Sequence, residues 1–429
     1  YNYEKPWADL KTRLEPGKML EKGDKIYCYG DKKVYLEFIP ASSNKTTGIG
    51  SLSIYITDDA GKFPQVHKQL MSAENAESCY MDSLGNLRVM SNTGKELWSY
   101  KYDAPGTFSY PGSRSVPTID GNRIYSCGPY GDLYCIDINT HKPIWNKNIM
   151  KDFGGTKIPV WAITQCPLIY GDLLFVSYSK DPYAGLVAYN KLTGNIVWKT
   201  DAFANETYAS PIVAKIAGED HIVIAFSSTN NYMHKDVEMT MGKIIGFKPQ
   251  TGEILWEYNN WENAIQVAPV FDAGEGRIIV MGGYELGTVM IKVEKTADAR
   301  FSVKEIFRHN DFGDHTKPPI LYNGYFYAQF STNNRRDGLC CMSMEGKVLW
   351  KTMRNPLFDK GSMILADGLL LATDGRQTLY LIQPDPSGFK PLASAKILDM
   401  GQNWGPIALV DGKLLIRDQG KLKCIKVTQ

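Results

Sequence analysis

Hydrophobic and polar residues alternate along this chain in short runs, and Gly, Asp and Asn separate one run from the next. Residues 116–121 form one such run and end in a turn, and residues 122–127 form the next. A third run covers residues 133–138, and a fourth leads to Trp145. Alternation with a period of two between turn residues is typical of antiparallel strands and not of helices. The pattern therefore predicts an all-β chain.

A short motif, a Thr-Gly turn followed by a strand with Trp, recurs along the sequence and divides it into units. It stands as Asn-Thr-Gly-Lys-Glu-Leu-Trp at residues 92–98 and returns, with changes, at 192–198, 250–256 and 344–350. A degenerate copy covers residues 139–145, and copies without Trp lie at 303–307 and 389–396. Four strands in each unit of about 40–50 residues are the sequence signature of a β-propeller blade.

The number of blades follows from the anchors of these units. The anchors lie at positions 98, 145, 198, 256, 307, 350 and about 393, which makes seven. Residues 406–427 add three strands, and we expect an N-terminal strand, 51–57 or 33–39, to complete them, because closure removes an exposed sheet edge. We therefore predict an eight-bladed propeller of four-stranded antiparallel blades, closed by pairing of N- and C-terminal strands, with seven blades as the alternative. Residues 1–24 are expected to form an N-terminal extension and residues 25–429 a single propeller domain.

The repeat resembles the tryptophan-docking repeat of PQQ-type propellers, the quinoprotein alcohol dehydrogenase-like family that includes the BamB-like envelope propellers. The resemblance implies that each Trp of an outer strand packs between neighbouring blades and that the Gly permits the tight turn beside it. The tryptophans expected in this structural role are Trp98, Trp145, Trp198, Trp256 and Trp350.

Quinoprotein dehydrogenases of this family bind PQQ with calcium and commonly cover it with a disulfide between adjacent cysteines. Cys340 and Cys341 are adjacent, but alignment of the repeats places them on a third strand, where neighbouring side chains point to opposite faces. We therefore interpret them as structural cysteines, with a quinone-capping disulfide as the alternative; whether they form a disulfide is left open. The cysteines match no zinc-binding spacing.

The segments that precede each first strand hold the candidate ligand-binding residues, because in such propellers these segments converge around the central channel. They are Arg114, Trp161, Gln165, Tyr208, Gln266, His315, Lys317, Lys360 and Trp404. This polar and aromatic set, poor in carboxylates, suits an anionic or carbohydrate ligand and not a calcium ion. The alternative is a set of solvated loops.

Glu206 lies beside Tyr208, but a lone carboxylate makes no acid–base pair. Residues 309–315 are interpreted as a polar turn and not as a metal site.

Composition and charge exclude several classes of protein. The chain has 429 residues, of which 43% are hydrophobic, and its formal net charge is +2. These values indicate a folded globular chain without the positive charge that nucleic acid binding requires. No P-loop, dinucleotide-binding fingerprint or nucleophile elbow is present, and the apolar runs are too short to span a bilayer.

Three functions remain as hypotheses. The first is a non-catalytic binding or scaffold propeller of the cell envelope, without a cofactor, whose partner is a protein or a small anionic or carbohydrate ligand. The second is an alcohol or sugar oxidoreductase that uses PQQ with calcium, and the third is a carbohydrate-active enzyme. From the resemblance we expect a periplasmic, outer-membrane-associated or extracellular monomer. Because the chain begins at Tyr1, we interpret it as one from which a leader or lipid anchor has been removed. Whether it is an enzyme, and which ligand it binds, is left open.

Overall fold

The computed structural model describes residues 25–28, 33–39, 51–57, 78–81, 86–90, 96–101, 114–229, 240–283, 285–331, 336–399 and 401–427. The chain divides into two compact units. The continuous unit is Ala73–Pro319, and the discontinuous unit combines Tyr1–Ser72 with Ile320–Gln429. The predicted N-terminal extension, residues 1–24, lies outside the described residues, and the single domain from residue 25 onward stays a prediction.

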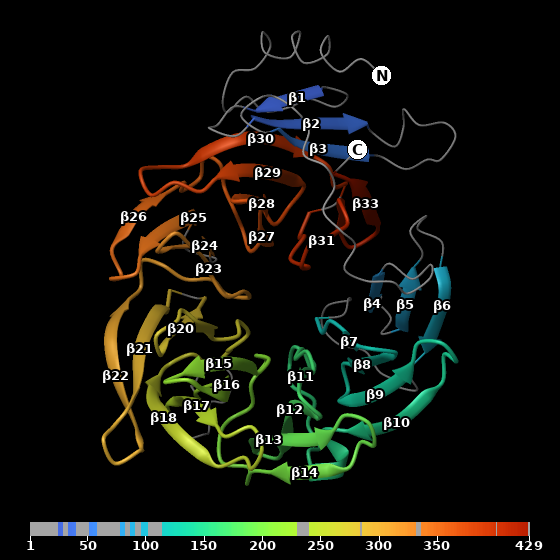
Figure 1. The fold of residues 1–429 in the computed structure, drawn as a ribbon, viewed down its shortest axis with the longest axis vertical. Helices are drawn as coiled ribbons and strands as arrows, with labels where there is room; N and C mark the ends of the chain where they lie inside the picture. The colour runs from blue at the N-terminus through green and yellow to red at the C-terminus, as the bar shows by residue number, and fades with distance from the viewer. Residues whose placement is uncertain are drawn as a thin grey trace. The chain divides into compact units, whose positions relative to one another are not determined.

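The continuous unit consists of successive antiparallel sheets in which each strand pairs with the next along the chain. A three-stranded sheet contains β4 (Ser78–Met81), β5 (Asn86–Met90) and β6 (Glu96–Lys101). Four four-stranded sheets follow, and a short 3-10 turn, η2 (Lys151–Phe153), separates the first two of them. Their strands are β7 (Thr118–Asp120), β8 (Arg123–Cys127), β9 (Asp132–Asp137) and β10 (Pro143–Asn148); β11 (Leu168–Tyr170), β12 (Leu173–Lys180), β13 (Tyr183–Asn190) and β14 (Ile196–Lys199); β15 (Ile212–Ile216), β16 (Glu219–Phe226), β17 (Gly242–Phe247) and β18 (Ile254–Trp261); β19 (Phe271–Asp272), β20 (Arg277–Gly282), β21 (Gly287–Lys295) and β22 (Phe301–His309). Within this unit the sheets β7–β22 follow one another along an arc, with the last strand of each outermost (Figure 1).

The discontinuous unit contains sheets of the same kind. Two are four-stranded, and two, at the two ends of the chain, are three-stranded. The strands are β1 (Lys25–Cys28), β2 (Lys33–Ile39) and β3 (Ser51–Thr57); β23 (Ile320–Tyr322), β24 (Tyr325–Ser331), β25 (Arg336–Ser343) and β26 (Val348–Lys351); β27 (Met363–Ala366), β28 (Leu369–Thr373), β29 (Thr378–Gln383) and β30 (Lys390–Lys396); β31 (Ala408–Val410), β32 (Lys413–Arg417) and β33 (Leu422–Lys426).

The architecture is an all-β β-propeller of four-stranded antiparallel blades, as the repeats predict, but the number of blades is seven and not eight. Seven sheets, from β4–β6 to β27–β30, carry the seven repeat units. The eighth blade required β2 or β3 as a fourth strand for β31–β33. In the described structure β2 and β3 instead pair with each other over seven residues, Lys33–Ile39 against Ser51–Thr57, and β1 completes their sheet. Pairing between strands close in sequence has a small loop-closure cost, which favours this local sheet over the predicted closure.

Burial along the strands shows why the repeat forms these sheets. The middle strands are buried on both faces, as in β16, where residues 221–226 are all buried, because neighbouring sheets cover each face. The outer strand β22 instead alternates between half-buried and exposed positions along its full length. Alternation along an outer strand and continuous apolar runs in the middle strands are the patterns expected for stacked sheets.

Two tryptophans of the repeat, Trp145 and Trp198, bind the turn that begins the next copy of the motif. The Trp145 indole N–H donates to the carbonyl oxygen of Lys191 at 3.0 Å, and its ring packs directly on Gly194. Trp198 donates to the carbonyl oxygen of Pro249 at 2.8 Å and packs on Gly252 in the same way. Both glycines have positive φ, and a Cβ atom there would overlap the indole ring, so the motif requires Gly for two reasons.

Trp350 and Trp98 make contacts that are related to these two but not identical with them. Trp350 donates to the carbonyl oxygen of Asp385 at 2.8 Å, and the half-buried Trp98 stacks on His141 with ring centroids 4.6 Å apart. The buried Trp256 has a different partner: its indole N–H donates to Nδ1 of His221 at 2.9 Å. Burial lowers the pKa of His221, which keeps the imidazole neutral and Nδ1 able to accept this bond.

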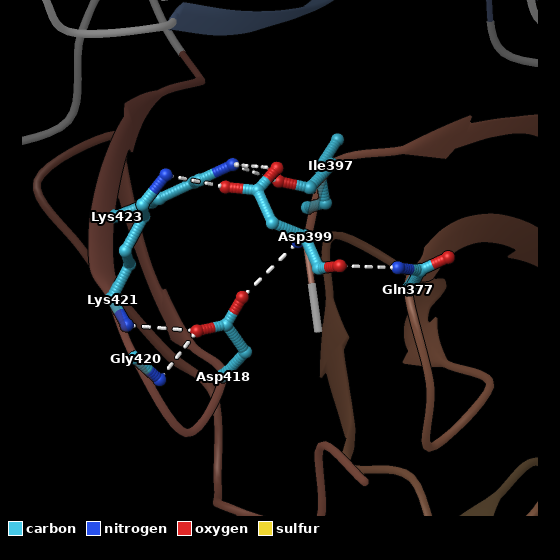
Figure 2. A network of polar contacts seen from close by, with 7 residues as sticks. All are labelled: Gln377, Ile397, Asp399, Asp418, Gly420, Lys421 and Lys423. Carbon is cyan, nitrogen blue, oxygen red and sulfur yellow. Dashed lines mark hydrogen bonds and ion pairs between the residues drawn. The ribbon is translucent and has the colours of Figure 1, made fainter. Parts of the chain in front are cut away.

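A polar network fastens the last sheet, β31–β33, to the sheet before it (Figure 2). The Asp399 carboxylate binds Lys421 at 2.8 Å and Lys423 at 3.5 Å, and its backbone N–H donates to Asp418 at 3.1 Å. Lys423 also donates to the carbonyl oxygen of Ile397 at 2.6 Å, and Gln377 donates to the carbonyl oxygen of Asp399 at 2.5 Å. These contacts, together with the apolar cluster that both sheets share, hold the three-stranded sheet β31–β33 against β27–β30.

Candidate ligand-binding site

The continuous unit brings three of the predicted residues together: Arg114, Trp161 and Tyr208. Arg114 lies just before β7, Trp161 lies between η2 and β11, and Tyr208 lies between β14 and β15. Tyr208 is 9% exposed; its backbone N–H donates to the carbonyl oxygen of Gln266 at 3.0 Å, and its carbonyl oxygen accepts from the Thr164 hydroxyl at 2.6 Å. These bonds fix the backbone at Tyr208, and its side chain is almost fully buried.

The Tyr208 hydroxyl is the centre of this group. Burial raises the pKa of Tyr208 to about 12, and the charge of Glu206 acts in the same direction. Hydrogen bonds from the backbone N–H groups of Trp161 and Val160 and the charge of Arg114 oppose that rise. Burial also lowers the pKa of Arg114, although the guanidinium remains charged at any ordinary pH. A cation and a phenol therefore lie close together beside the backbone of Trp161, which is chemistry suited to recognition.

Glu206 is the residue that the sequence undervalued, because its neighbours come from another part of the chain. Ser179 pairs with Ala184, and Ala184 forms a bridge to Ala204, which brings Glu206 toward Ser179 and Asp181. Burial, and secondarily the charge of Asp181, raises the pKa of Glu206 to about 7. A carboxyl group that is partly protonated at neutral pH can donate a hydrogen bond or a proton. No local sequence motif predicts that Glu206 lies near Asp181, because an isolated bridge between Ala184 and Ala204 brings the two segments together.

The raised pKa of Glu206 predicts a pH dependence of stability. Because the folded state favours the protonated carboxyl, Glu206 contributes stability that is fully present below pH 4.5 and is lost as the pH rises through about 7. The shift corresponds to up to about 3 kcal/mol between these limits. We expect Glu206→Gln, which cannot ionise, to remove this part of the pH dependence. Chemical denaturation of both proteins between pH 4.5 and 8 measures it, and parallel curves for the two proteins would show that Glu206 ionises as freely as in the unfolded chain.

Gln165 and Gln266, also predicted as ligand-binding residues, bind the protein itself. Both amide ends of the buried Gln165 bond the backbone of Ser177, at 2.6 and 3.0 Å. The fully buried Gln266 accepts from Trp261 and Asn263, each at 2.8 Å, and donates to the carbonyl oxygen of Ala268 at 2.5 Å. These bonds fix the segments before β11 and β19, so the two side chains position the loops of the site.

His315 and Lys317 lie in the loop between β22 and β23. The buried Asp314 carboxylate accepts from the backbone N–H groups of Thr316 and Lys317 at 2.8 and 3.1 Å, which makes the polar turn expected for this segment. The His315 ring packs on Gly283, and the Lys317 ammonium donates to the Thr316 hydroxyl at 3.0 Å. In the described part of the chain, no group of three or more His, Cys, Asp or Glu residues could hold a metal ion.

Lys360 and Trp404, the last two predicted residues, come together in the discontinuous unit. The Lys360 ammonium lies 4.9 Å from the centroid of the Trp404 ring, close enough for a cation–π interaction. The structure thus places the nine candidates in one group around Tyr208, one pair at Trp404, two glutamines that position loops, and two residues, His315 and Lys317, in the loop before β23.

The adjacent cysteines do not fit a quinone cap. Cys340 and Cys341 lie within β25 opposite Ala328 and Tyr327, both are fully buried, and both are free thiols. Cys341 packs in an apolar cluster with Tyr327, and burial raises its pKa to about 11. Buried, protonated thiols on opposite faces of a strand are structural cysteines, as the repeat alignment indicates.

Comparison with known proteins agrees with this architecture. The family profile described as outer membrane protein assembly factor BamB matches residues 84–352, more than half of the chain. The chain belongs to this family. The BamB of Moranella endobia is 20% identical over 290 residues, which cover 64% of this chain and 67% of that protein.

Quinoprotein dehydrogenases match a shorter part of this BamB-family chain. The quinoprotein ethanol dehydrogenase of Pseudomonas aeruginosa is 27% identical over 165 residues, which cover 37% of this chain and 24% of that enzyme. The match thus spans about a quarter of the enzyme.

Solved structures share the fold. The crystal structure of BamB from Moraxella catarrhalis superposes with a TM-score of 0.52 at 12% identity and covers 82% of this chain and 94% of that one. A europium-containing methanol dehydrogenase gives a TM-score of 0.54, also at 12% identity, over 95% of this chain and 85% of that one.

Proposed function

We propose that this protein is a non-catalytic binding propeller of the cell envelope that holds a protein partner during the assembly of outer membrane proteins. Membership of the BamB family supports this role. The match to the BamB of Moranella endobia covers 67% of that protein. We place the protein in the periplasm at the outer membrane, as a monomer. Among the described residues, no helix is long and apolar enough to cross a bilayer.

The observation that carries this proposal is an exposed apolar surface beside Arg114 and Tyr208, which we call the 158–161 surface. Ile158 is 39% exposed and Val160 is 50% exposed. The backbone N–H groups of Val160 and Trp161 donate to the Tyr208 hydroxyl, which places this segment beside the tyrosine. The backbone N–H of Thr156 donates to the Asp181 carboxylate at 2.8 Å, which ties this loop to the turn before β13. Exposed apolar side chains around an Arg and aromatic residues are typical of the centre of a protein interface.

A pair of matched variants tests the proposal in a Gram-negative strain that lacks the gene. Val160 and Val197 are both 50% exposed, but Val197 lies on the outer strand β14. We expect Val160→Asp to fold normally yet fail to restore the amount of folded outer membrane β-barrel protein, because a charge in an apolar interface is desolvated without a partner. Val197→Asp should restore it.

Two results would contradict the proposal. If loss of the gene leaves the amount of folded outer membrane β-barrel protein unchanged, the proposed role is wrong. If Val160→Asp restores that amount fully, the proposed binding surface is wrong. Circular dichroism and thermal unfolding of the two purified variants separate a loss of binding from a loss of fold.

The second candidate function is a PQQ-dependent alcohol or sugar oxidoreductase, which the 27% identity to quinoprotein dehydrogenases favours. In such an enzyme, PQQ with calcium would supply the redox chemistry. The described residues do not fit the group well: Cys340 and Cys341 are buried away from each other, and the described chain offers no carboxylate-rich metal site. We therefore assign no step of such a reaction to this chain.

A further inference from the structure

Three loops of the discontinuous unit are joined backbone to backbone around Gly361 and Gly375. The N–H of Asp359 donates to the carbonyl oxygen of Asp374 at 2.9 Å, and the N–H of Asn403 donates to that of Gly375 at 2.7 Å. A Cβ atom on Gly361 or Gly375 would overlap the backbone of a neighbouring loop. Segments 359–361, 373–376 and 402–404 therefore form one rigid base, which lowers the entropic cost of binding a ligand there.

The side chains on this base combine one aromatic surface with charges of both signs. Trp404 is 43% exposed, and the Lys360 ammonium covers one part of its ring at 4.9 Å. Asp359 lies 3.2 Å from Lys360 and 4.0 Å from Arg376. Lys360 has φ of 59°, a left-handed conformation that costs free energy in a residue other than Gly and is often kept at functional sites.

Asn403 supplies an independent observation beside Trp404. Its side chain is 1% exposed, and within the described residues neither its Nδ2 nor its Oδ1 atom has a hydrogen-bond partner. Burying a primary amide without partners is unfavourable, so such groups call for an explanation. A ligand hydroxyl that reaches the amide would satisfy both its donor and its acceptor.

We propose that Trp404, Lys360, Asp359 and Arg376, here called the Trp404 cluster, bind a sugar acid, that is, a pyranose ring with a carboxylate. The exposed indole suits the apolar face of a pyranose, Asp359 accepts hydrogen bonds from its hydroxyls, and Lys360 and Arg376 bind its carboxylate. The inference rests on the proposed function as a binding propeller and adds a class of ligand to it.

The charges distinguish this ligand from two simpler ones. A planar aromatic acid has no hydroxyls to donate to Asp359. A neutral sugar offers no carboxylate to Lys360 and Arg376. The sugar acid alone offers a matching group to the aromatic surface, to Asp359 and to the two cations together.

Isothermal titration calorimetry with D-glucuronic acid and D-galacturonic acid, each beside its methyl ester, tests the proposal. We expect at least one acid to bind with a dissociation constant in the millimolar range or tighter and its ester to bind at least tenfold more weakly. Trp404→Ala should weaken binding of that acid at least tenfold, and Lys360→Gln should reduce the acid to the affinity of its ester. Tyr183→Ala, which removes a comparably exposed aromatic ring from the continuous unit, should change nothing.

Each other outcome overturns the proposal. If neither acid binds, the ligand class is wrong; if acid and ester bind equally, the role of the cations is wrong. Wild-type affinity in Trp404→Ala places any binding elsewhere, and circular dichroism confirms that each variant is folded. Val160→Asp should bind the acid normally, so a failed sugar-acid site and a failed partner-binding surface give different results.

Discussion

Replacing Trp256 by Ala is expected to lower the free energy of unfolding by about 3–5 kcal/mol, because the change removes a large buried side chain and leaves a cavity. Trp256 is 4% exposed and belongs to an apolar cluster that β16, β20 and β21 also line. Its loss also leaves Nδ1 of the buried His221 without its donor, which adds the cost of an unsatisfied polar atom. Chemical denaturation measures the change.

A control comes from an exposed position on the strand that carries Trp256. Ile254 is 45% exposed on β18, so Ile254→Ala should change the free energy of unfolding by no more than about 0.5 kcal/mol. If Trp256→Ala unfolds at the denaturant midpoint of the wild type, the indole contributes nothing to the packing between sheets and the structural role of the repeat tryptophans is wrong.

Replacing Gln266 by Leu is expected to cost about 3–4 kcal/mol, although the two side chains are similar in size. The change removes the acceptor of Trp261 and Asn263 and the donor to Ala268, and it leaves these buried groups without partners, each at about 1–3 kcal/mol. The exposed Gln419, which makes one bond of 3.3 Å to Gln402, provides the control, and Gln419→Leu should be nearly neutral. Thermal unfolding compares the two variants; equal stability would return Gln266 to the list of residues available to a ligand.

Local pattern was enough to predict the strands. The runs at 122–127 and 133–138 correspond to β8 (Arg123–Cys127) and β9 (Asp132–Asp137), and the copy with Phe307 in place of Trp lies on β22. Such strands can be read from sequence because each repeat fixes its own alternation and its own turns. The number of blades was harder to predict, because closure of the ring depends on which distant strands pair. In the structure β2 pairs with β3, its near neighbour in sequence.

The candidate site shows a different limit. Residue type predicted Arg114, Trp161 and Tyr208 as ligand-binding residues, and the structure places Arg114 and the backbone of Trp161 beside Tyr208. The same reasoning also included Gln165 and Gln266, whose amides satisfy buried backbone groups. A sequence shows which side chains can bind a ligand, and only coordinates show which of them the protein already uses. Glu206 was passed over for the same reason, since Asp181 and Ser179 reach it through a bridge that no motif predicts.

We propose that this chain recognises a partner and carries out no quinone chemistry, and the melting temperature with PQQ and calcium tests this proposal most directly. A ligand that binds only the folded state raises the free energy of unfolding with the logarithm of its concentration above its dissociation constant, by about 2.7 kcal/mol at one hundred times that constant. The account predicts an unchanged melting temperature and an unchanged PQQ absorbance spectrum at micromolar to millimolar PQQ with excess calcium. A rise of several degrees together with a spectral shift would contradict it and make the quinoprotein function the better one.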